Sequence, residues 1–318
     1  MTTPRQPSFE VRVPASTANL GAGFDCFGLA LNLYLTVRAT VLPGSGNRSR
    51  VRSRGAKGSS LLARVPEENL IFCAMQHAAE CEGVALPPVR LAVHNAIPIA
   101  GGLGSSAAAI VAGISLASAV AGKTITTDSA LRYATELEGH ADNVAAALLG
   151  GLVITAIREK GSVLAIRKAW PAEIRIVAVT PDLILETKKA RAVLPSSVTR
   201  EDAVYNVQRS ALLLAALEEE RFDLLWDALQ DRLHQYCRES LIPGLGDILR
   251  MPCAPGLLGI ALSGAGPSVI ALATDHFDEI GKSVARRFER QSLASTIRIL
   301  DVADSGHTIT ASNPSARK

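Results

Sequence analysis

The stretch IPIAGGLGSSAAAIVAG, residues 97–113, decides the fold of this chain. Gly101, Gly102 and Gly104 remove side chains at points where the backbone must turn sharply or approach a ligand closely. The segment that follows, residues 105–120, is apolar on all sides, which is typical of a buried helix. The stretch therefore predicts a bare turn that leads straight into a helix of the protein core.

The start of such a helix offers a binding site for an anion. The first N–H groups of a helix have no intrahelical partner, and together they carry about half a positive charge. Phosphate is the common ligand there, and the hydroxyls of Ser105 and Ser106 could contact it or a bound Mg²⁺. The alternative is a tight strand-to-helix turn in which one of these serines caps the helix. The stretch lacks both the Gly-Lys-Ser/Thr of a Walker A loop and the spacing of a dinucleotide fingerprint.

Two further glycine-rich turns lie far from this loop in the sequence. They are PASTANLGAGFD at residues 14–25 and LSGAGPSV at residues 262–269, and each follows an expected strand. Either turn alone is a weak signal. Three such turns in this order lead us to expect that they converge on one ligand.

The composition of the chain argues against several classes of function. Its 318 residues are 48% hydrophobic and carry a formal net charge of only +3. Such a chain can bury a sizeable core, and it creates no field that favours nucleic acid or a membrane. Five scattered cysteines without a C-x-x-C pair indicate neither a disulfide framework nor a zinc site. With no apolar leader visible, we expect a cytoplasmic location.

The arginine-rich segment at residues 48–57 is a local exception to the balanced charge. Arg48, Arg50, Arg52 and Arg54 alternate along it. Alternation places such residues on one face of a strand, so we favour an exposed basic edge or loop over an anion-binding patch.

The remaining elements mix strands and helices without a strict βαβ rhythm. We expect strands at residues 9–13, 29–42, 87–98, 152–157, 174–181 and 256–274, and helices at residues 69–83, 105–120, 129–140, 141–151, 203–220 and 222–239. The segment at residues 29–42 is either a strand pair or one long bent strand, and the first strand should stop at Pro14. Asp128 is the expected cap of its helix. These elements predict an α+β architecture.

The three glycine-rich turns resemble the three motifs of the GHMP small-molecule kinases. Four further segments resemble the homoserine kinases within that superfamily: ANLGAGFD, EGHADNVAAALLGG, ETKKARAVLP and LHQYCRESLIPG. The resemblance implies an α+β fold of two domains. The first, residues 8–167, would be like domain 2 of ribosomal protein S5; the second, residues 168–306, would be ferredoxin-like; and residues 307–318 would form a flexible tail.

The resemblance also implies a binding site for Mg-ATP. The phosphates would be wrapped by Pro98, Ile99, Ala100, Gly101, Gly102, Leu103, Gly104, Ser105, Ser106, Ala107 and Ala108, with Gly264 and Gly266 close by. Ser106 and a glutamate would hold Mg²⁺, because this ion takes hard oxygen ligands. The family context favours Glu138, and Glu136 remains open.

A zwitterionic amino acid with a terminal hydroxyl is the substrate that the resemblance implies. Arg191 and Arg238 match the family's carboxylate-binding arginines, with Arg232 as the fallback for the second; Asp25 matches a residue that binds the ammonium; and Asn19, His140 and Asn143 match further polar contacts. Asp142, Asn143 and Thr187 are the candidates near the transferred group, where Asp142 and Asn143 would orient the hydroxyl.

The expected reaction is transfer of the γ-phosphoryl group of ATP to L-homoserine, which gives O-phospho-L-homoserine for threonine biosynthesis. A kinase of the same fold that acts on another small alcohol, such as mevalonate or shikimate, is one alternative. A metabolite sensor without turnover is another. Among partners, the resemblance allows a homodimer.

Overall fold

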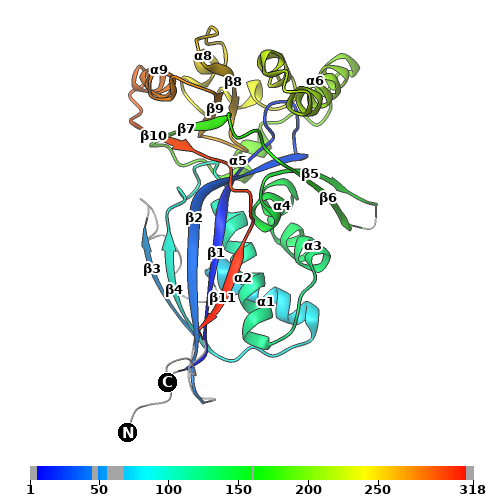
Figure 1. The fold of residues 1–318 in the computed structure, drawn as a ribbon, viewed down its shortest axis with the longest axis vertical. Helices are drawn as coiled ribbons and strands as arrows, with labels where there is room; N and C mark the ends of the chain where they lie inside the picture. Colours follow the sequence, from blue (N-terminus) through cyan, green and yellow to red (C-terminus); the bar gives the residue numbers. More distant parts are fainter. Residues whose placement is uncertain (1–5, 45–48, 56–67, 160, 313–318) are drawn as a thin grey trace.

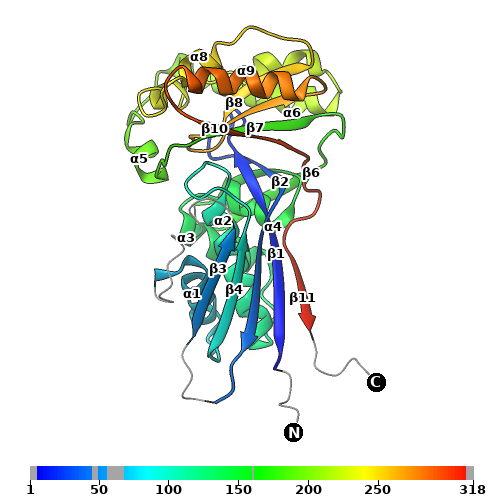
Figure 2. The same ribbon diagram turned by 90° about the vertical axis from the view of Figure 1, so that its left-hand side faces the viewer.

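The computed structural model describes residues 6–44, 49–55, 68–159 and 161–312. The molecule is elongated, and two sheets follow each other along its long axis, each with helices packed on one face (Figures 1 and 2). This arrangement confirms the α+β class.

The larger sheet has the strand order β11-β1-β2-β4-β3, and a hairpin of β5 and β6 joins it through β2. Its strands are β1 (Ser8–Ala18), β2 (Phe27–Val41), β3 (Arg50–Gly55), β4 (Val89–Asn95), β5 (Leu152–Ile157), β6 (Val163–Lys168) and β11 (Thr308–Ser312). β2 is one long strand rather than a strand pair, and it pairs with β1, β4 and β5.

Four helices cover one face of the larger sheet (Figure 1). They are α1 (Leu70–Glu82), α2 (Ser105–Ala121), α3 (Thr127–Glu138) and α4 (Asp142–Leu149). The central helix α2 is buried from Ala107 to Ala117, as its predominantly apolar sequence predicts. A side chain at Gly113 would collide with the backbone of α1 at Ile71, so this glycine sets the close approach of the two helices.

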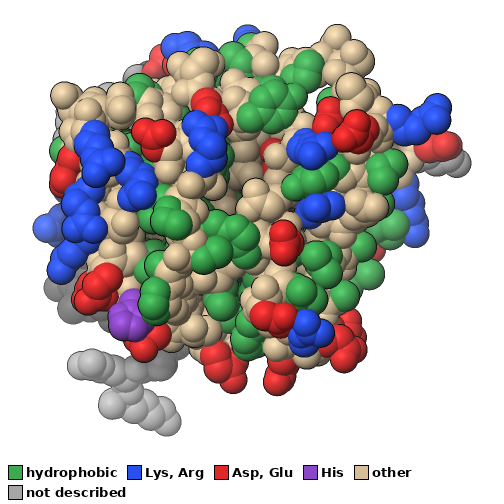
Figure 3. Space-filling view, turned by 90° about the horizontal axis from the view of Figure 1, so that it is seen from above, with side chains coloured by type: hydrophobic (Ala, Val, Ile, Leu, Met, Phe, Trp, Pro, Cys, Tyr) green, Lys and Arg blue, Asp and Glu red, His purple; other side chains and the backbone are tan. Residues whose placement is uncertain are grey.

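The smaller sheet has the strand order β10-β7-β9-β8, and all its pairs are antiparallel. Its strands are β7 (Arg175–Pro181), β8 (Leu257–Leu262), β9 (Val269–Ala273) and β10 (Ser295–Leu300). The helices of this half are α5 (Thr187–Ala192), α6 (Arg200–Glu218), α7 (Leu225–Ala228), α8 (Leu245–Leu249) and α9 (Phe277–Glu289), with short 3₁₀ turns η3 (Phe222–Leu224) and η4 (Tyr236–Arg238). On the end face that these helices form, charges of both signs lie interspersed (Figure 3), as on an ordinary solvated surface.

Two segments of the larger sheet, the end of β1 and the C-terminal residues 308–312, differ from expectation. β1 does not stop at Pro14 but continues to Ala18, because a register shift between Pro14 and Ala15 lets the strand bend past the proline. The expectation of a flexible tail is wrong for residues 308–312, which form β11 against β1. Ile309 lies opposite Val11 there, and the added strand satisfies the edge hydrogen bonds of β1.

The expected helix over residues 222–239 is also wrong. The segment breaks into η3, α7 and η4 because the carboxylate of Asp231 accepts the backbone N–H groups of Leu233, His234 and Gln235. An Asp that binds the backbone of the following residues favours a turn over a continuous helix. This turn places His234 and Arg238 inside the protein.

The helix caps differ from expectation in two places. Gly104, with a positive φ of 68°, is the N-cap of α2, so neither Ser105 nor Ser106 caps the helix, and both lie in its first turn. The cap of α3 is Thr126, whose side chain accepts the backbone N–H of Ser129. Asp128 lies in the first turn, where its charge still complements the helix dipole.

The arginine-rich segment forms the outer strand of the larger sheet. Arg50, Arg52 and Arg54 lie on β3, which pairs only with β4 among the described strands. Arg48 and Lys57 lie outside the described residues. The prediction of an exposed basic edge is confirmed for the three described arginines.

The chain passes from the larger to the smaller sheet between β6 and β7, and β11 returns to the larger sheet. The expected domain boundary near residue 168 falls at this passage and stays a prediction. Across the described segments, we find no helix that is both long and apolar enough to span a membrane.

Candidate active site

A pocket of about 340 Å³ lies where the two sheets meet. Its lining comes from seven separate stretches of the chain: Asn19, Phe24 and Asp25; Leu70; residues 99–102, 104–106 and 109; Glu138, His140, Asp142 and Asn143; residues 185–187 with Arg191; Arg238; and residues 264–266. A concave, mixed polar and apolar site between two halves of a protein is the usual form of a small-molecule site.

The three glycine-rich turns lie together at this pocket. Gly264 donates its N–H to the Ala18 carbonyl (3.2 Å) and accepts a hydrogen bond from Asn19 Nδ2 (3.0 Å). Ser263 Oγ donates to the Gly102 carbonyl at 2.6 Å. Hydrogen bonds therefore join all three turns directly, and their convergence on one ligand stays a prediction.

The glycines of the loop at residues 101–104 are required by these contacts between turns. A Cβ at Gly102 would lie 2.6 Å from the Ser263 carbonyl oxygen and 2.8 Å from that of Gly266. A Cβ at Gly104 would collide with Ser16 Oγ on β1. Both glycines also have positive φ angles, so protein packing and backbone conformation alike exclude a side chain.

The N-terminus of α2 faces the pocket through Gly104, Ser105 and Ser106. The helix brings its unpaired N–H groups and partial positive charge to this wall. Four other members of the expected phosphate loop do not line the pocket. Leu103, Ala107 and Ala108 are buried beneath it, and Pro98 lines a neighbouring hollow behind residues 99–101.

Ser106 and Glu138 form a pair of oxygen ligands at this wall. Ser106 Oγ donates a hydrogen bond of 2.5 Å to Glu138 Oε1, and both residues line the pocket. Glu136, two residues earlier on α3, lies elsewhere: it pairs with His77 and Arg132 on the protein surface. The turn of the helix thus separates the two glutamates that the sequence left as alternatives.

His140 and Asp142 form a buried pair beside this glutamate. His140 Nδ1 lies 2.6 Å from Asp142 Oδ1, which also accepts the backbone N–H of Asn143. Burial alone would lower the pKa of His140, but the hydrogen bond to Asp142 and the charges of Asp142 and Glu138 outweigh it and raise that pKa. Asn143 Oδ1 in turn accepts a hydrogen bond from Ser16 Oγ.

Asp25 and Arg191 form a bidentate ion pair on the opposite wall, with N–O distances of 2.6 and 3.0 Å. The side chains are about one-third exposed, so the pair is accessible from the pocket. The Asp25 hydrogen bond and charge raise the pKa of Arg191 despite partial burial. Thr187, the first residue of α5, lies exposed on the same side.

Arg238 lies beneath this pair and is only 1% exposed. Its Nε donates to the Ala190 carbonyl (3.0 Å), and its Nη1 donates to the Gly264 carbonyl (3.0 Å) and to His234 Nδ1 (2.9 Å). Burial and the neighbouring charge of Arg191 lower the pKa of Arg238 to about 10, so it stays charged at neutral pH. Among the described residues, no carboxylate lies within ion-pair distance of it.

Arg232, the fallback for Arg238, is not part of the pocket. Its Nη1 pairs with Glu201 (3.2 Å) and Asp202 (3.6 Å) at the start of α6. The structure therefore contradicts the fallback, because the break after α7 turns Arg238, and not Arg232, towards the pocket.

Sequence reasoning missed Phe24 and His234. The Phe24 ring lies 5.4 Å from the Arg191 guanidinium and 5.7 Å from that of Arg238, and it stacks on the His234 ring at 5.1 Å. Burial lowers the pKa of His234, and the neutral ring accepts from Arg238 and donates from Nε2 to the Gly21 carbonyl (2.8 Å). Both residues lie in segments that the sequence singled out, Phe24 beside Asp25 and His234 in LHQYCRESLIPG, but neither was named as a site residue.

Comparison with known proteins shows which family the chain resembles. The model of the GHMP kinases N terminal domain matches residues 69–151, and that of the GHMP kinases C terminal region matches residues 213–290. The homoserine kinase of Desulfitobacterium hafniense is 39% identical over 94% of this chain and 99% of its own length. That of Solibacter usitatus is 42% identical over 95% of this chain and 97% of its own.

A solved structure agrees with these relatives. The crystal structure of homoserine kinase from Cytophaga hutchinsonii superposes with a TM-score of 0.84, at 28% identity, over 98% of this chain and 99% of that one. Since sequence relatives cover both chains almost completely, this chain belongs to the GHMP kinases and, within them, to the homoserine kinase family.

Proposed function

We propose that the protein transfers the γ-phosphoryl group of ATP to the side-chain hydroxyl of L-homoserine and forms O-phospho-L-homoserine. The observation that carries this proposal is Arg238, a buried cation beside the pocket with no carboxylate partner among the described residues. A buried charge is costly unless it is paired, so this site favours an anionic ligand. The carboxylate of an amino acid supplies that charge.

The phosphate wall suits the triphosphate of ATP. Backbone N–H groups at the start of α2, between Gly104 and Ser106, would bind the phosphates, with Gly264 and Gly266 close by. Ser106 and Glu138 fit a Mg²⁺ ion, because two oxygen donors in contact face the same pocket. When bound, this ion neutralises charge on the phosphate oxygens.

The opposite wall suits a zwitterion. Arg191 and Arg238 would bind the substrate carboxylate, and Asp25 would accept hydrogen bonds from the ammonium. In the free protein Asp25 and Arg191 pair with each other. A bound zwitterion would replace that ion pair with an ammonium–Asp25 pair and a carboxylate shared by the two arginines, so each charge would contact one of opposite sign. A substrate without an ammonium, such as mevalonate or shikimate, would leave Asp25 without its partner.

Chemistry at the hydroxyl requires orientation more than a strong base. The bond from the γ-phosphorus to the bridging oxygen of ADP breaks, a bond to the substrate oxygen forms, and the hydroxyl proton is released to solvent. A loose transition state needs little prior deprotonation. Asp142 is buried, and its Oδ1 already binds His140 and the Asn143 backbone. We therefore assign positioning roles to Asn19, His140, Asp142 and Asn143, with Thr187 near the transferred group.

The experiment is ADP production by the purified protein with Mg-ATP and, separately, L-homoserine, L-serine, mevalonate or shikimate. We expect turnover that depends on homoserine and is lost in Arg191→Ala. Lys188→Ala, an exposed position on the same helix, is the matched control and should keep full activity. Turnover with mevalonate or shikimate would contradict the role of Asp25. ATP binding without any turnover would favour a sensor instead.

We also propose a cytoplasmic homodimer. Leu164 and Ile166 lie exposed on β6, on the hairpin that projects from the side of the larger sheet (Figure 1). Exposed apolar side chains on a projecting hairpin suit a contact between two copies. Light scattering should give twice the chain mass, and Ile166→Lys should lower it to the monomer; a monomeric native protein contradicts the proposal.

A further inference from the structure

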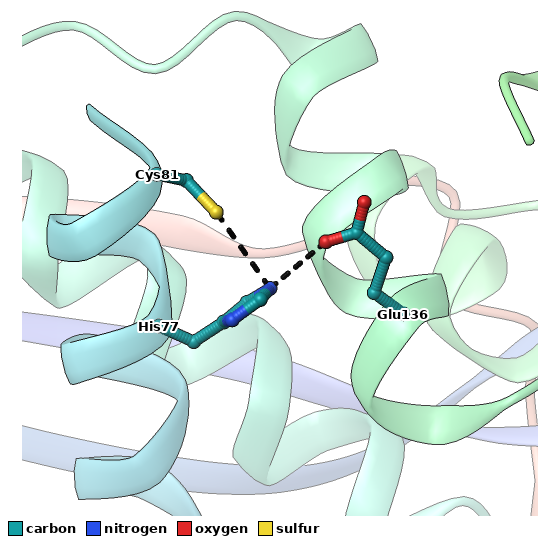
Figure 4. Close-up of side chains that lie close together, drawn as sticks. All are labelled: His77, Cys81 and Glu136. Carbon is teal, nitrogen blue, oxygen red and sulfur yellow. Dashed lines mark hydrogen bonds and ion pairs between the residues drawn. The ribbon is translucent and has the colours of Figure 1, made fainter.

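Three potential metal ligands meet on the surface between α1 and α3 (Figure 4). His77 and Cys81 lie one turn apart on α1, and Glu136 faces them from α3. His77 Nε2 is 2.9 Å from Glu136 Oε2 and 3.8 Å from Cys81 Sγ. The three ligand atoms all lie within 4.8 Å of one another.

These separations are close to those of a tetrahedral zinc site. Zinc binds nitrogen and oxygen at about 2.0–2.2 Å and sulfur at about 2.3 Å, so pairs of its ligand atoms are roughly 3.4–3.6 Å apart. The observed 2.9 and 3.8 Å bracket that range, and small side-chain rotations would open a place for the ion. An imidazole, a thiol and a carboxylate form a donor set that suits Zn²⁺ better than Mg²⁺.

The surroundings orient the ligands. Arg132 Nη1 holds Glu136 Oε1 at 3.1 Å, which leaves Oε2 directed at His77. The Tyr133 ring packs edge-on against the His77 ring, with centroids 5.9 Å apart. Outer contacts of this kind fix the direction of metal ligands and are part of a working site.

The cluster is separate from the candidate active site. Glu136, His77 and Cys81 do not line the active-site pocket, whereas Glu138 does. An ordinary ion pair between His77 and Glu136 would explain two of the three residues. Cys81 lies one helical turn from His77 on α1, and its sulfur adds a third potential ligand 3.8 Å from the same ring nitrogen.

We propose that His77, Cys81 and Glu136 form a Zn²⁺ site, completed by water, that joins α1 to α3. Both helices reach the active-site pocket, α1 through its first residue, Leu70, and α3 through its last residue, Glu138. Zinc held between them therefore stabilises the helical wall on which that pocket is built.

The free thiol must lose a proton when zinc binds. Burial, Glu136, Glu80 and Glu82 raise the pKa of Cys81, and Arg132 opposes them. The same acidic groups attract a divalent cation, and the ion stabilises the thiolate.

The test is titration of the chelator-treated protein with Zn²⁺ and, for spectroscopy, with Co²⁺. We expect one ion per chain and a thiolate-to-cobalt absorption band in the near ultraviolet. Cys81→Ser should remove the band, and His77→Gln or Glu136→Gln should weaken zinc binding by at least about tenfold. Melting curves in the presence of chelator verify that each variant folds.

Cys253→Ser is the matched control, because Cys253 is also exposed but belongs to the half with the smaller sheet. It should bind zinc like the native chain. Three results would overturn the proposal: no stoichiometric binding, a cobalt band that survives Cys81→Ser, or release of zinc by excess Mg²⁺. The last would assign the ion to Ser106 and Glu138. These readouts do not depend on kinase activity.

Discussion

The two walls of the active-site pocket are built in opposite ways. The proposed phosphate wall consists mainly of backbone from a single loop, residues 99–102 and 104–106, at the start of α2. The substrate wall consists of charged side chains, Asp25, Arg191 and Arg238, from three distant segments. One wall therefore depends on the absence of side chains, and the other depends on long side chains held in place by their neighbours.

This difference teaches where each wall is vulnerable. Adding a methyl group disrupts the phosphate wall, because Gly102 and Gly104 contact neighbouring turns. Removing a charge disrupts the substrate wall, because its charges are few and one of them, Arg238, is buried. Variants of the substrate wall should therefore lose activity towards L-homoserine, whereas variants of the phosphate wall should lose stability.

The largest effect should come from Arg238→Ala. Loss of a charged, bidentate-capable ligand for the substrate carboxylate should lower kcat/KM for L-homoserine by about 10³-fold, or roughly 4 kcal/mol. The affinity for ATP, measured with a fluorescent nucleotide, should change little. Arg232→Ala is the control, since its guanidinium pairs with Glu201 and not with the pocket. Equal losses in both variants would contradict the division into two walls.

Gly104→Ala should give the next largest effect, on stability. The new Cβ would collide with Ser16 Oγ at a positive φ of 68°, so we expect a loss of about 2–4 kcal/mol in the free energy of unfolding. Urea denaturation measures it. Gly122→Ala at the other end of α2 is the control, because it has a φ of 66° and open space.

Gly122→Ala should lower the free energy of unfolding by only about 1 kcal/mol, because only the strained backbone conformation opposes the new side chain. If both variants lose the same stability, the close contact between Gly104 and β1 is not what requires a glycine there.

Ser106→Ala should have a smaller effect, confined to the binding of Mg²⁺. Without the Ser106 hydroxyl, the Glu138 carboxylate loses one hydrogen bond and Mg²⁺ would lose one oxygen ligand. We expect about a tenfold rise in the Mg²⁺ concentration that gives half-maximal activity at fixed ATP. Ser105→Ala is the comparison and should shift this value less; a reversed order would move the ligand to Ser105.

The smallest effect concerns His140 and its partner. Asp142→Asn keeps an acceptor oxygen but removes the negative charge that helps to raise the pKa of His140, so that pKa should fall, as measured by NMR titration. In the native protein the pair stabilises the fold fully below the ordinary histidine pKa of about 6.5. This stabilisation is lost as the pH rises through the higher pKa of the folded state. A variant with unchanged pH dependence of unfolding would contradict the assignment.

Part of the candidate site was visible in the sequence because it is local. Glycines at 101, 102 and 104 followed by a run of small apolar residues specify a turn and a buried helix wherever the rest of the chain lies. The same holds for α1, whose spacing and Gly83 cap predict both ends of the helix correctly. Local backbone requirements of this kind need no knowledge of distant residues.

Long-range contacts escaped prediction for a physical reason. The helix expected at residues 222–239 breaks because Asp231 binds the following backbone, and this break brings His234 beneath Phe24. Residues 308–312 form a strand only because the edge of β1 is open to them. The strand at residues 308–312 depends on a partner that is distant in the sequence, and the break at Asp231 depends on a side chain that competes with helix formation. The spacing of apolar residues predicts neither contact.

The sequence by itself determined the α+β class, the bare glycine loop and the chemical types of the residues around it. The tertiary structure decided which of two similar residues lines the pocket: Glu138 rather than Glu136, and Arg238 rather than Arg232. The sequence gives the type of each residue, whereas the direction of its side chain depends on the turn of the helix and on the packing of segments that meet only in the folded chain.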